Sequence, residues 1–174
     1  MDVNGICLLL LDVDGVMTDG SINIHSDGSE TKRFFVRDGS ALVAWRKLGL
    51  QTGIITGRPS DVTTLRAREL GIDFVEQVPA MEKAAALERV CAAADVDVSQ
   101  VAFLGDDLGD LPVLVRVGYP MAVGDAAEEV RDTARYVTGA RGGRGAVREA
   151  VEHLLKSMNR WDEVLAAYGL QTQG

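Results

Sequence analysis

Two acidic clusters are the residues of this sequence best suited to chemistry, because each follows a run of apolar residues. The first run, residues 6–11 (ICLLLL), ends on Asp12 and Asp14. The second run, residues 101–104 (VAFL), is followed after one glycine by three carboxylates, Asp106, Asp107 and Asp110. Buried carboxylates are costly unless they are paired or bind a metal, and Mg2+ prefers oxygen ligands. The two clusters therefore predict one Mg2+ site where two strand ends meet.

Asp12 and Asp14 are spaced so that both could act on one phosphoryl group. The chain leaves its strand at this point, and Gly15 permits the bend that would carry Asp14 above Asp12. One carboxylate could then attack phosphorus while the other protonates the departing oxygen. The alternative is that both are ordinary turn or helix-capping aspartates.

Thr56 and Lys83 lie at further strand-to-helix junctions. A hydroxyl and a backbone amide, here Thr56 and Gly57, form an oxyanion cradle at such a turn. Lys83 begins the helix after the third strand and could reach the same edge. Taken alone, the threonine and glycine also fit a common turn, and the lysine fits a solvated surface charge.

Short apolar strands alternate with helical patterns, which predicts an α/β fold with a doubly wound, Rossmann-like parallel sheet. The expected strands are residues 6–11, 51–55, 74–76, 101–104 and 119–122. The expected helices are residues 40–48, 61–70, 81–94, 110–116 and 146–156. Ligands of such sheets bind at the carboxyl ends of the strands, where the acidic clusters and Thr56 fall.

The pattern between the first strand and the first helix predicts a β-hairpin at about residues 20–36. Residues 159–170 show helical spacing of apolar side chains and predict a short amphipathic tail helix. No stretch is long enough to act as a linker between units, so we expect one domain over residues 1–174.

Composition restricts the function classes. The 174 residues carry a net charge of −8, and a sequence pI near 4.7 argues against nonspecific nucleic-acid binding. No run approaches the roughly 18 apolar residues that cross a membrane. The N-terminal apolar run is short and lacks a basic leader, and two cysteines suit a reducing compartment, so we expect a cytoplasmic protein.

The ordered set Asp12, Asp14, Thr56, Lys83 and Asp106-Asp107 resembles the haloacid dehalogenase (HAD) superfamily. Longer segments resemble the family of 3-deoxy-D-manno-octulosonate 8-phosphate (Kdo-8-phosphate) phosphatases within it. These segments are DVDGVMTDG at residues 12–20, FVRDG at 35–39, ITGR at 55–58 and GGRGAVRE at 142–149. The gaps between the motifs are too short for a cap domain, so the resemblance is to capless members.

The resemblance implies a Mg2+-dependent phosphatase with an aspartyl-phosphate intermediate. Asp12 would be the nucleophile and Asp14 the acid and base, while Thr56 and Lys83 would stabilise the phosphoryl oxygens. The metal would be held by Asp12, the Asp14 carbonyl and Asp106, with waters oriented by Asp107 or Asp110.

The resemblance also implies a sugar-acid phosphate as the substrate, with Kdo-8-phosphate as the first choice. Gly57 belongs to the expected phosphate cradle, and Arg58 and Arg66 are expected to hold the sugar carboxylate. The sugar hydroxyls are expected to meet three neighbouring residues, Arg37, Asp38 and Gly39. The segment 142–145 is expected to lie across the site of its own or a neighbouring chain, with Arg144 near the bound anion; otherwise it is a flexible connector.

Phe35 departs from the family, which usually has asparagine here, and so keeps an N-acylneuraminate 9-phosphate open as an alternative substrate. A noncatalytic HAD-like module is a further alternative, which intact Asp12 and Asp14 disfavour. A receiver module is disfavoured because the third strand, residues 74–77 (FVEQ), supplies no accepting aspartate. The resemblance finally implies a homotetramer whose hairpins pack together and whose neighbours close each site.

Overall fold

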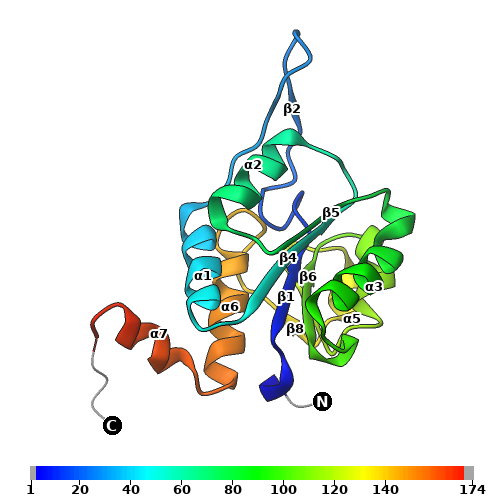
Figure 1. Ribbon diagram of the computed structural model, residues 1–174. Coiled ribbons are helices and arrows are strands. Elements are labelled where there is room, and N and C mark those ends of the chain that lie inside the picture. The colour runs from blue at the N-terminus through cyan, green and yellow to red at the C-terminus, as the bar shows by residue number, and fades with distance from the viewer. Residues whose placement is uncertain (1–2, 171–174) are drawn as a thin grey trace.

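A computed structural model describes residues 3–170, and its centre is a six-stranded sheet in the order β5-β4-β1-β6-β7-β8 (Figure 1). All neighbouring strands of this sheet run parallel. The strands are β1 (Leu8–Leu11), β4 (Gln51–Thr56), β5 (Phe74–Gln77), β6 (Val101–Gly105), β7 (Tyr119–Ala122) and β8 (Tyr136–Val137). The expected doubly wound α/β fold is confirmed.

Helices cover both faces of the sheet, which is why the central strands are apolar throughout and not alternating. On one face lie α1 (Val36–Lys47) and α6 (Ala146–Ser157), which pack against each other; α2 (Asp61–Leu70) and α7 (Trp161–Ala167) contact α1. The other face is covered by α3 (Lys83–Ala94), α4 (Leu111–Leu114) and α5 (Glu128–Thr133). Residues 3–170 also contain four single-turn 3₁₀ helices: η1 (Val3–Gly5), η2 (Ala80–Glu82), η3 (Val98–Gln100) and η4 (Leu108–Asp110).

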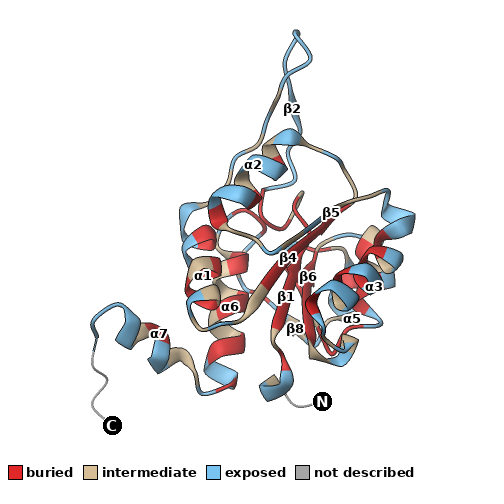
Figure 2. Ribbon diagram, in the orientation of Figure 1, coloured by how far each residue is buried: buried red, intermediate tan, exposed pale blue. Residues whose placement is uncertain are grey.

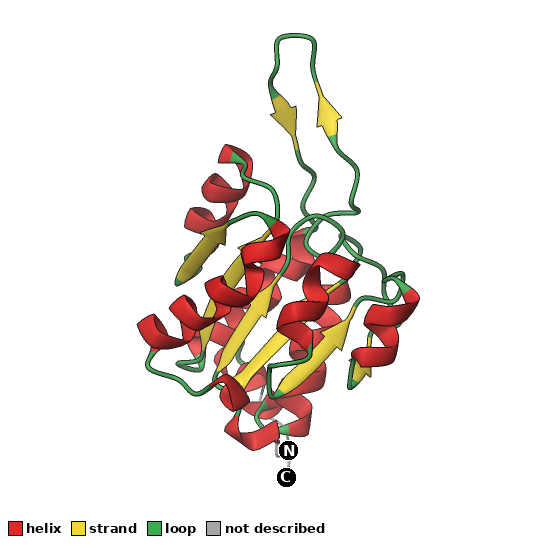
Figure 3. Cartoon of the chain, turned by 90° about the vertical axis from the view of Figure 1, so that its right-hand side faces the viewer, coloured by secondary structure: helices red, strands yellow, loops and turns green. Residues whose placement is uncertain are grey.

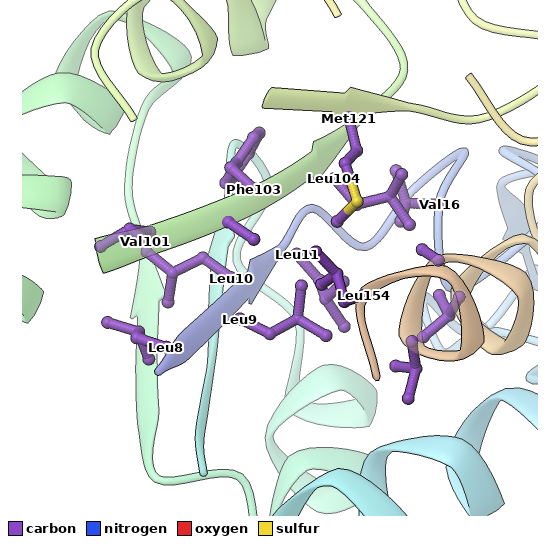
Figure 4. Close-up of a cluster of buried hydrophobic side chains, with 14 of the residues drawn as sticks. Leu8, Leu9, Leu10, Leu11, Val16, Val101, Phe103, Leu104, Met121 and Leu154 are labelled. Atoms are coloured by element: carbon purple, nitrogen blue, oxygen red, sulfur yellow. The ribbon is translucent and has the colours of Figure 1, made fainter. Parts of the chain in front are cut away.

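The core lies around β1, all four of whose leucines are inaccessible to solvent (Figure 2). Figure 4 shows them with Phe103 and Leu104 of β6 and with Leu154 of α6. Each fully buried side chain of this size contributes about 1.5–3 kcal/mol to stability. The same burial makes β1 a rigid support for the aspartates that follow it.

The hairpin between β1 and α1 projects from the body of the molecule (Figures 1 and 3). Its paired strands, β2 (Asn23–Ile24) and β3 (Glu30–Thr31), are antiparallel and each only two residues long. The hairpin predicted at about residues 20–36 is therefore present, but its paired strands lie only between Asn23 and Thr31. Residues 32–35 instead lead back to the body, where the side chain of Lys32 is buried.

Several boundaries differ from the sequence predictions. Helix α1 begins at Val36 and not at Ser40. Its first turn is held by Asp38, whose carboxylate accepts hydrogen bonds from the backbone N–H groups of Gly145 and Arg148 at the start of α6. The expected helices 81–94 and 110–116 each begin as a 3₁₀ turn, η2 or η4. The sequence analysis missed α5 and β8, which are short and carry little apolar periodicity.

The sheet changes winding direction between β1 and β6. Strands β4 and β5 lie on one side of this pair, and β7 and β8 lie on the other. The carboxyl ends of β1 and β6 therefore form the switch point where such folds bind ligands.

Between Asp14 and Thr56 the described chain holds only the hairpin, α1 and β4, so no cap domain is inserted there. No helix among residues 3–170 is long and apolar enough to cross a membrane.

Candidate active site

A cleft of about 330 Å³ opens at the carboxyl ends of the central strands. Its lining contains most of the residues expected to carry chemistry: Asp12, Asp14, Thr56, Gly57, Arg58, Lys83, Asp106, Asp107 and Asp110. These residues come from the ends of β1, β4 and β6 and from the start of α3. The sequence prediction that they share one edge of the sheet is confirmed.

Lys83 is the centre of a buried ion-pair cluster. Its Nζ lies 3.2 Å from Asp12 Oδ1 and 2.7 Å from Asp110 Oδ1, and its side chain is only 3% exposed. Burial opposes the charge of this ammonium, but Asp12 and Asp110 outweigh it and raise the pKa of Lys83. The lysine is therefore a fixed cation beside the Asp12 carboxylate, placed to bind an anion.

Asp110 holds the loop that carries Asp106. Its Oδ2 accepts hydrogen bonds from the backbone N–H groups of Asp106, at 2.9 Å, and Asp107, at 3.4 Å. Gly105 leaves room for this arrangement, since a side chain there would meet Asp110. Asp110 was expected to orient waters around a metal, whereas the structure also makes it the partner of Lys83.

The acidic cluster fits a divalent cation. One carboxylate oxygen from each of Asp12, Asp106 and Asp110 lies within 4.8 Å of the others, and Asp106 Oδ1 is buried without a hydrogen-bond partner among the described residues. Burial, reinforced by the neighbouring carboxylates, raises the pKa of Asp12 to about 6 and that of Asp106 to about 8. A nearby positive charge favours the ionised form of such crowded carboxylates. A hard cation such as Mg2+ suits this oxygen-only set.

The loop after β1 is folded tightly against the loop after β6. Gly15 adopts a positive φ of 92°, and a Cβ atom there would overlap the Asp106 carboxylate. Thr18 is buried, donates a hydrogen bond to the Val13 carbonyl and accepts one from the Gly15 N–H at 3.4 Å. The glycine therefore permits the close approach of the two loops, and the threonine fixes the turn that presents Asp14.

Asp14 has a partner that the sequence analysis missed. Its Oδ1 accepts a hydrogen bond from the Nζ of Lys32, which comes from the base of the hairpin. Glu30 lies 3.6 Å from the same ammonium and also pairs with Arg58. The available signal was the alternation of Glu30 and Lys32 along a short strand, but only the folded chain shows that they pair with Arg58 and Asp14, two residues that line the cleft.

The position of the Asp38 side chain differs from the prediction. We expected it to contact sugar hydroxyls, but the residue is only 2% exposed and does not line the cleft. Its carboxylate accepts hydrogen bonds from the backbone N–H groups of Gly145, at 3.3 Å, and Arg148, at 2.8 Å. Asp38 therefore caps the N-terminus of α6, where a carboxylate satisfies free N–H groups.

Of the other residues expected at the sugar, Arg58 lines the cleft, whereas Arg37, Gly39 and Arg66 lie outside it. Gly39 and Arg66 come together in a separate hollow of about 370 Å³ between α1 and α2. There the Arg66 guanidinium packs against Gly39 and pairs with Glu69 at 2.7 Å. Arg37 is exposed in the first turn of α1, and Phe35, half-buried at its N-terminus, faces Gly145.

Within one chain, the segment 142–145 is neither a flexible connector nor a cover over the mouth of its own cleft. Gly142 and Gly143 press against the backbone of residues 15–19, where any side chain on either glycine would overlap. The Gly143 N–H also donates to the Val16 carbonyl at 2.9 Å. Arg144 is 56% exposed, and its Nη2 lies 3.8 Å from Asp19 Oδ2. The segment therefore supports, from behind, the loop that presents Asp14.

Comparison with known proteins agrees with this geometry. Residues 73–151 match the haloacid dehalogenase-like hydrolase family. The 3-deoxy-D-manno-octulosonate 8-phosphate phosphatase of Yersinia pestis is 41% identical over 153 residues, which are 88% of this chain and 81% of that protein. The corresponding phosphatase of Escherichia coli K12 is 40% identical over 156 residues, or 90% of this chain and 82% of that protein.

Solved structures give the same result. The phosphatase of this name from Moraxella catarrhalis, in complex with magnesium, phosphate and Kdo, superposes with a TM-score of 0.91 at 38% identity, covering 95% of each chain. The cobalt-bound phosphatase from Haemophilus influenzae superposes with a TM-score of 0.91 at 31% identity, covering 97% of this chain and 98% of that one. The chain therefore belongs to the family of 3-deoxy-D-manno-octulosonate 8-phosphate phosphatases, within the haloacid dehalogenase-like hydrolases.

Proposed function

We propose that this protein hydrolyses Kdo-8-phosphate to Kdo and inorganic phosphate with the help of Mg2+. The observation that carries the proposal is the convergence of Asp12, Asp14, Lys83 and Asp106 in one cleft at the switch point. The relatives of known name act on this substrate, and one of them binds magnesium, phosphate and Kdo together.

In the first step, an Asp12 carboxylate oxygen attacks phosphorus and the bond from phosphorus to the sugar oxygen breaks. Asp14 gives its proton to the departing sugar oxygen, which leaves as the alcohol. In the second step, Asp14 takes a proton from water as that water attacks the aspartyl phosphate. Phosphate is released and the Asp12 carboxylate is regenerated, so both residues return to their starting states.

The charge on the transferring phosphoryl group needs fixed positive partners. Lys83, already held by Asp12 and Asp110, supplies one, and the Thr56 hydroxyl with the Gly57 N–H supplies hydrogen-bond donors. Asp12, the Asp14 carbonyl and Asp106 would hold Mg2+, with Asp107 and Asp110 beyond them. Bound Mg2+ would neutralise charge on the phosphoryl oxygens and keep the carboxylates ionised.

Recognition of the sugar acid needs cations, and Arg58 is the arginine that lines the cleft. Arg37, Arg66 and Arg144 lie outside it and would reach a substrate only in the site of a neighbouring chain. We propose a homotetramer in which hairpins pack together, supported by Ile22 and Ile24 on the hairpin, 53% and 67% exposed. We also place the enzyme in the cytoplasm, in keeping with two free cysteines.

The test is turnover of purified Kdo-8-phosphate, N-acetylneuraminate 9-phosphate and simple hexose phosphates, each with Mg2+ and with EDTA. We expect the highest kcat/KM for Kdo-8-phosphate and loss of all activity in EDTA. Preference for N-acetylneuraminate 9-phosphate would move the substrate to the alternative that Phe35 leaves open. Absence of turnover on every ester would indicate a noncatalytic module.

A further inference from the structure

Lys32 belongs to none of the sequence motifs, yet it is a buried cation in direct contact with a residue of the proposed chemistry. We propose that Lys32 is a positioning residue for Asp14: it holds one carboxylate oxygen and so leaves the other as the oxygen that carries the proton. This inference rests on the proposed phosphatase reaction, but not on which sugar phosphate is the substrate.

The two oxygens of Asp14 have different surroundings. Oδ1 is bound by the Lys32 ammonium, whereas Oδ2 is buried and has no hydrogen-bond partner among the described residues. A carboxyl with both oxygens free could rotate and present either one. With Oδ1 held by Lys32, Oδ2 is the Asp14 oxygen that has no partner among the described residues, and Asp14 lines the cleft in which the departing group would lie.

Lys32 is itself held in place. Its side chain is only 2% exposed, and Glu30 lies 3.6 Å from its Nζ. Glu30 also pairs with Arg58 and accepts a hydrogen bond from the Ser60 hydroxyl at 2.7 Å. The base of the hairpin is thus tied to the loop after β1 and to the loop after β4. An ammonium fixed on both sides restrains its carboxylate partner better than a solvated lysine, which loses more side-chain entropy.

Holding Asp14 in this way should matter for one step, the transfer of its proton to the leaving oxygen. As the bond between phosphorus and the leaving oxygen breaks, the Asp14 Oδ2–H bond breaks and the proton joins that oxygen. A sugar or glycerol oxygen needs this proton, whereas p-nitrophenolate is stable without it. Loss of the Lys32 contact should therefore slow esters of aliphatic alcohols much more than p-nitrophenyl phosphate.

The experiment compares Lys32→Met with Lys32→Arg and with Arg33→Met, a matched control that removes an exposed positive charge from the next residue. Each is assayed with Mg2+ on p-nitrophenyl phosphate, phenyl phosphate, glycerol phosphate and Kdo-8-phosphate. For Lys32→Met we expect kcat to fall at least about tenfold more for the aliphatic esters than for p-nitrophenyl phosphate, with KM nearly unchanged. Lys32→Arg should recover part of the loss, and Arg33→Met should match the parent protein.

Equal losses on all esters, or a loss confined to KM, would overturn the proposal, because they indicate a structural support or a direct substrate contact. Thermal unfolding and light scattering establish that each variant is folded and unchanged in assembly. If Lys32→Met does not fold, Lys32→Gln is assayed on the same series. Wild-type turnover of simple esters without turnover of Kdo-8-phosphate would contradict the proposed substrate and leave the Lys32 test intact.

Discussion

The Asp38 carboxylate accepts a hydrogen bond from the backbone N–H of Arg148 at 2.8 Å, so a residue in the first turn of α1 caps the start of α6. These residues are 110 positions apart in the chain. The contact joins two of the segments that carry the family resemblance, residues 35–39 and 142–149. Both segments therefore stabilise the structure around the site, and within one chain they do not line the cleft.

Asp38→Ala should destabilise the fold by about 1–2 kcal/mol, because two backbone N–H groups of α6 lose their acceptor. For a chain of this size the melting temperature should fall by roughly 2–8 °C. The measurement is thermal unfolding beside Asp132→Ala, which removes an exposed carboxylate from α5. A large rise in KM with unchanged stability would instead return Asp38 to a direct role at the sugar.

Gly143→Ala should both destabilise the protein and lower kcat. Gly143 has a φ of 63°, and a methyl group there would overlap the backbone of Thr18 and Asp19. A clash with backbone and an unfavourable φ together cost at least about 2 kcal/mol, and any relaxation moves the loop that presents Asp14. Gly139→Ala is the control, because its methyl would meet only the Glu149 carboxylate, at 3.7 Å. Equal behaviour of the two variants would contradict the supporting role.

Without metal, the stability of the protein should fall as pH rises from about 4 to about 8. Burial and the neighbouring carboxylates raise the pKa of Asp106 from 3.8 to about 8, so in this window the folded state holds a proton that the unfolded chain has released. Excess protons on the folded state mean that stability decreases with pH. Mg2+ binds the ionised carboxylates and should raise the melting temperature most at the upper end of the window.

The measurement is the melting temperature in EDTA and in Mg2+ at several pH values across that window. Asp106→Asn serves as a control, because it removes the titrating group and should flatten the profile in EDTA. A melting temperature in EDTA that rises through the window would contradict the prediction.

Asp12→Asn should abolish turnover of every ester, because an amide cannot act as the nucleophile. The same change relieves repulsion among buried carboxylates, so the metal-free protein should be no less stable than the parent. Initial rates and thermal unfolding test the two halves of this statement. Retention of more than about 1% of kcat in a preparation free of other phosphatases would contradict the covalent mechanism.

Much of the site was predictable because its residues follow directly from strand ends. Asp12 follows β1 and Asp106 follows β6, and apolar runs mark both strands, so topology alone brings the two carboxylates together. Lys83 was predictable in the same way from its place at the start of α3. Here local pattern and long-range structure agree.

The remaining features depend on contacts that no local pattern encodes. Asp38 caps a helix 110 residues away, and the polar hairpin contains one buried lysine that pattern cannot distinguish from its exposed neighbour Arg33. The glycines at 142 and 143 resemble a flexible connector until the loop they press against is known. Short elements such as β8 form because a neighbouring strand pairs with them, and not because of their own composition.

The position of β1 beside β6 has one more consequence. Among the described residues, the strands before Lys83 and those after it meet within the sheet at this single pair. Neither half of the chain holds a complete site, since Asp12, Asp14 and Thr56 come from one and Lys83, Asp106 and Asp110 from the other. Activity therefore depends on the pairing of β1 with β6. Two fragments produced by dividing the chain near residue 80 should each be inactive, and activity should return only when they reassemble. Even slight opening between β1 and β6 should silence the enzyme well before the protein unfolds.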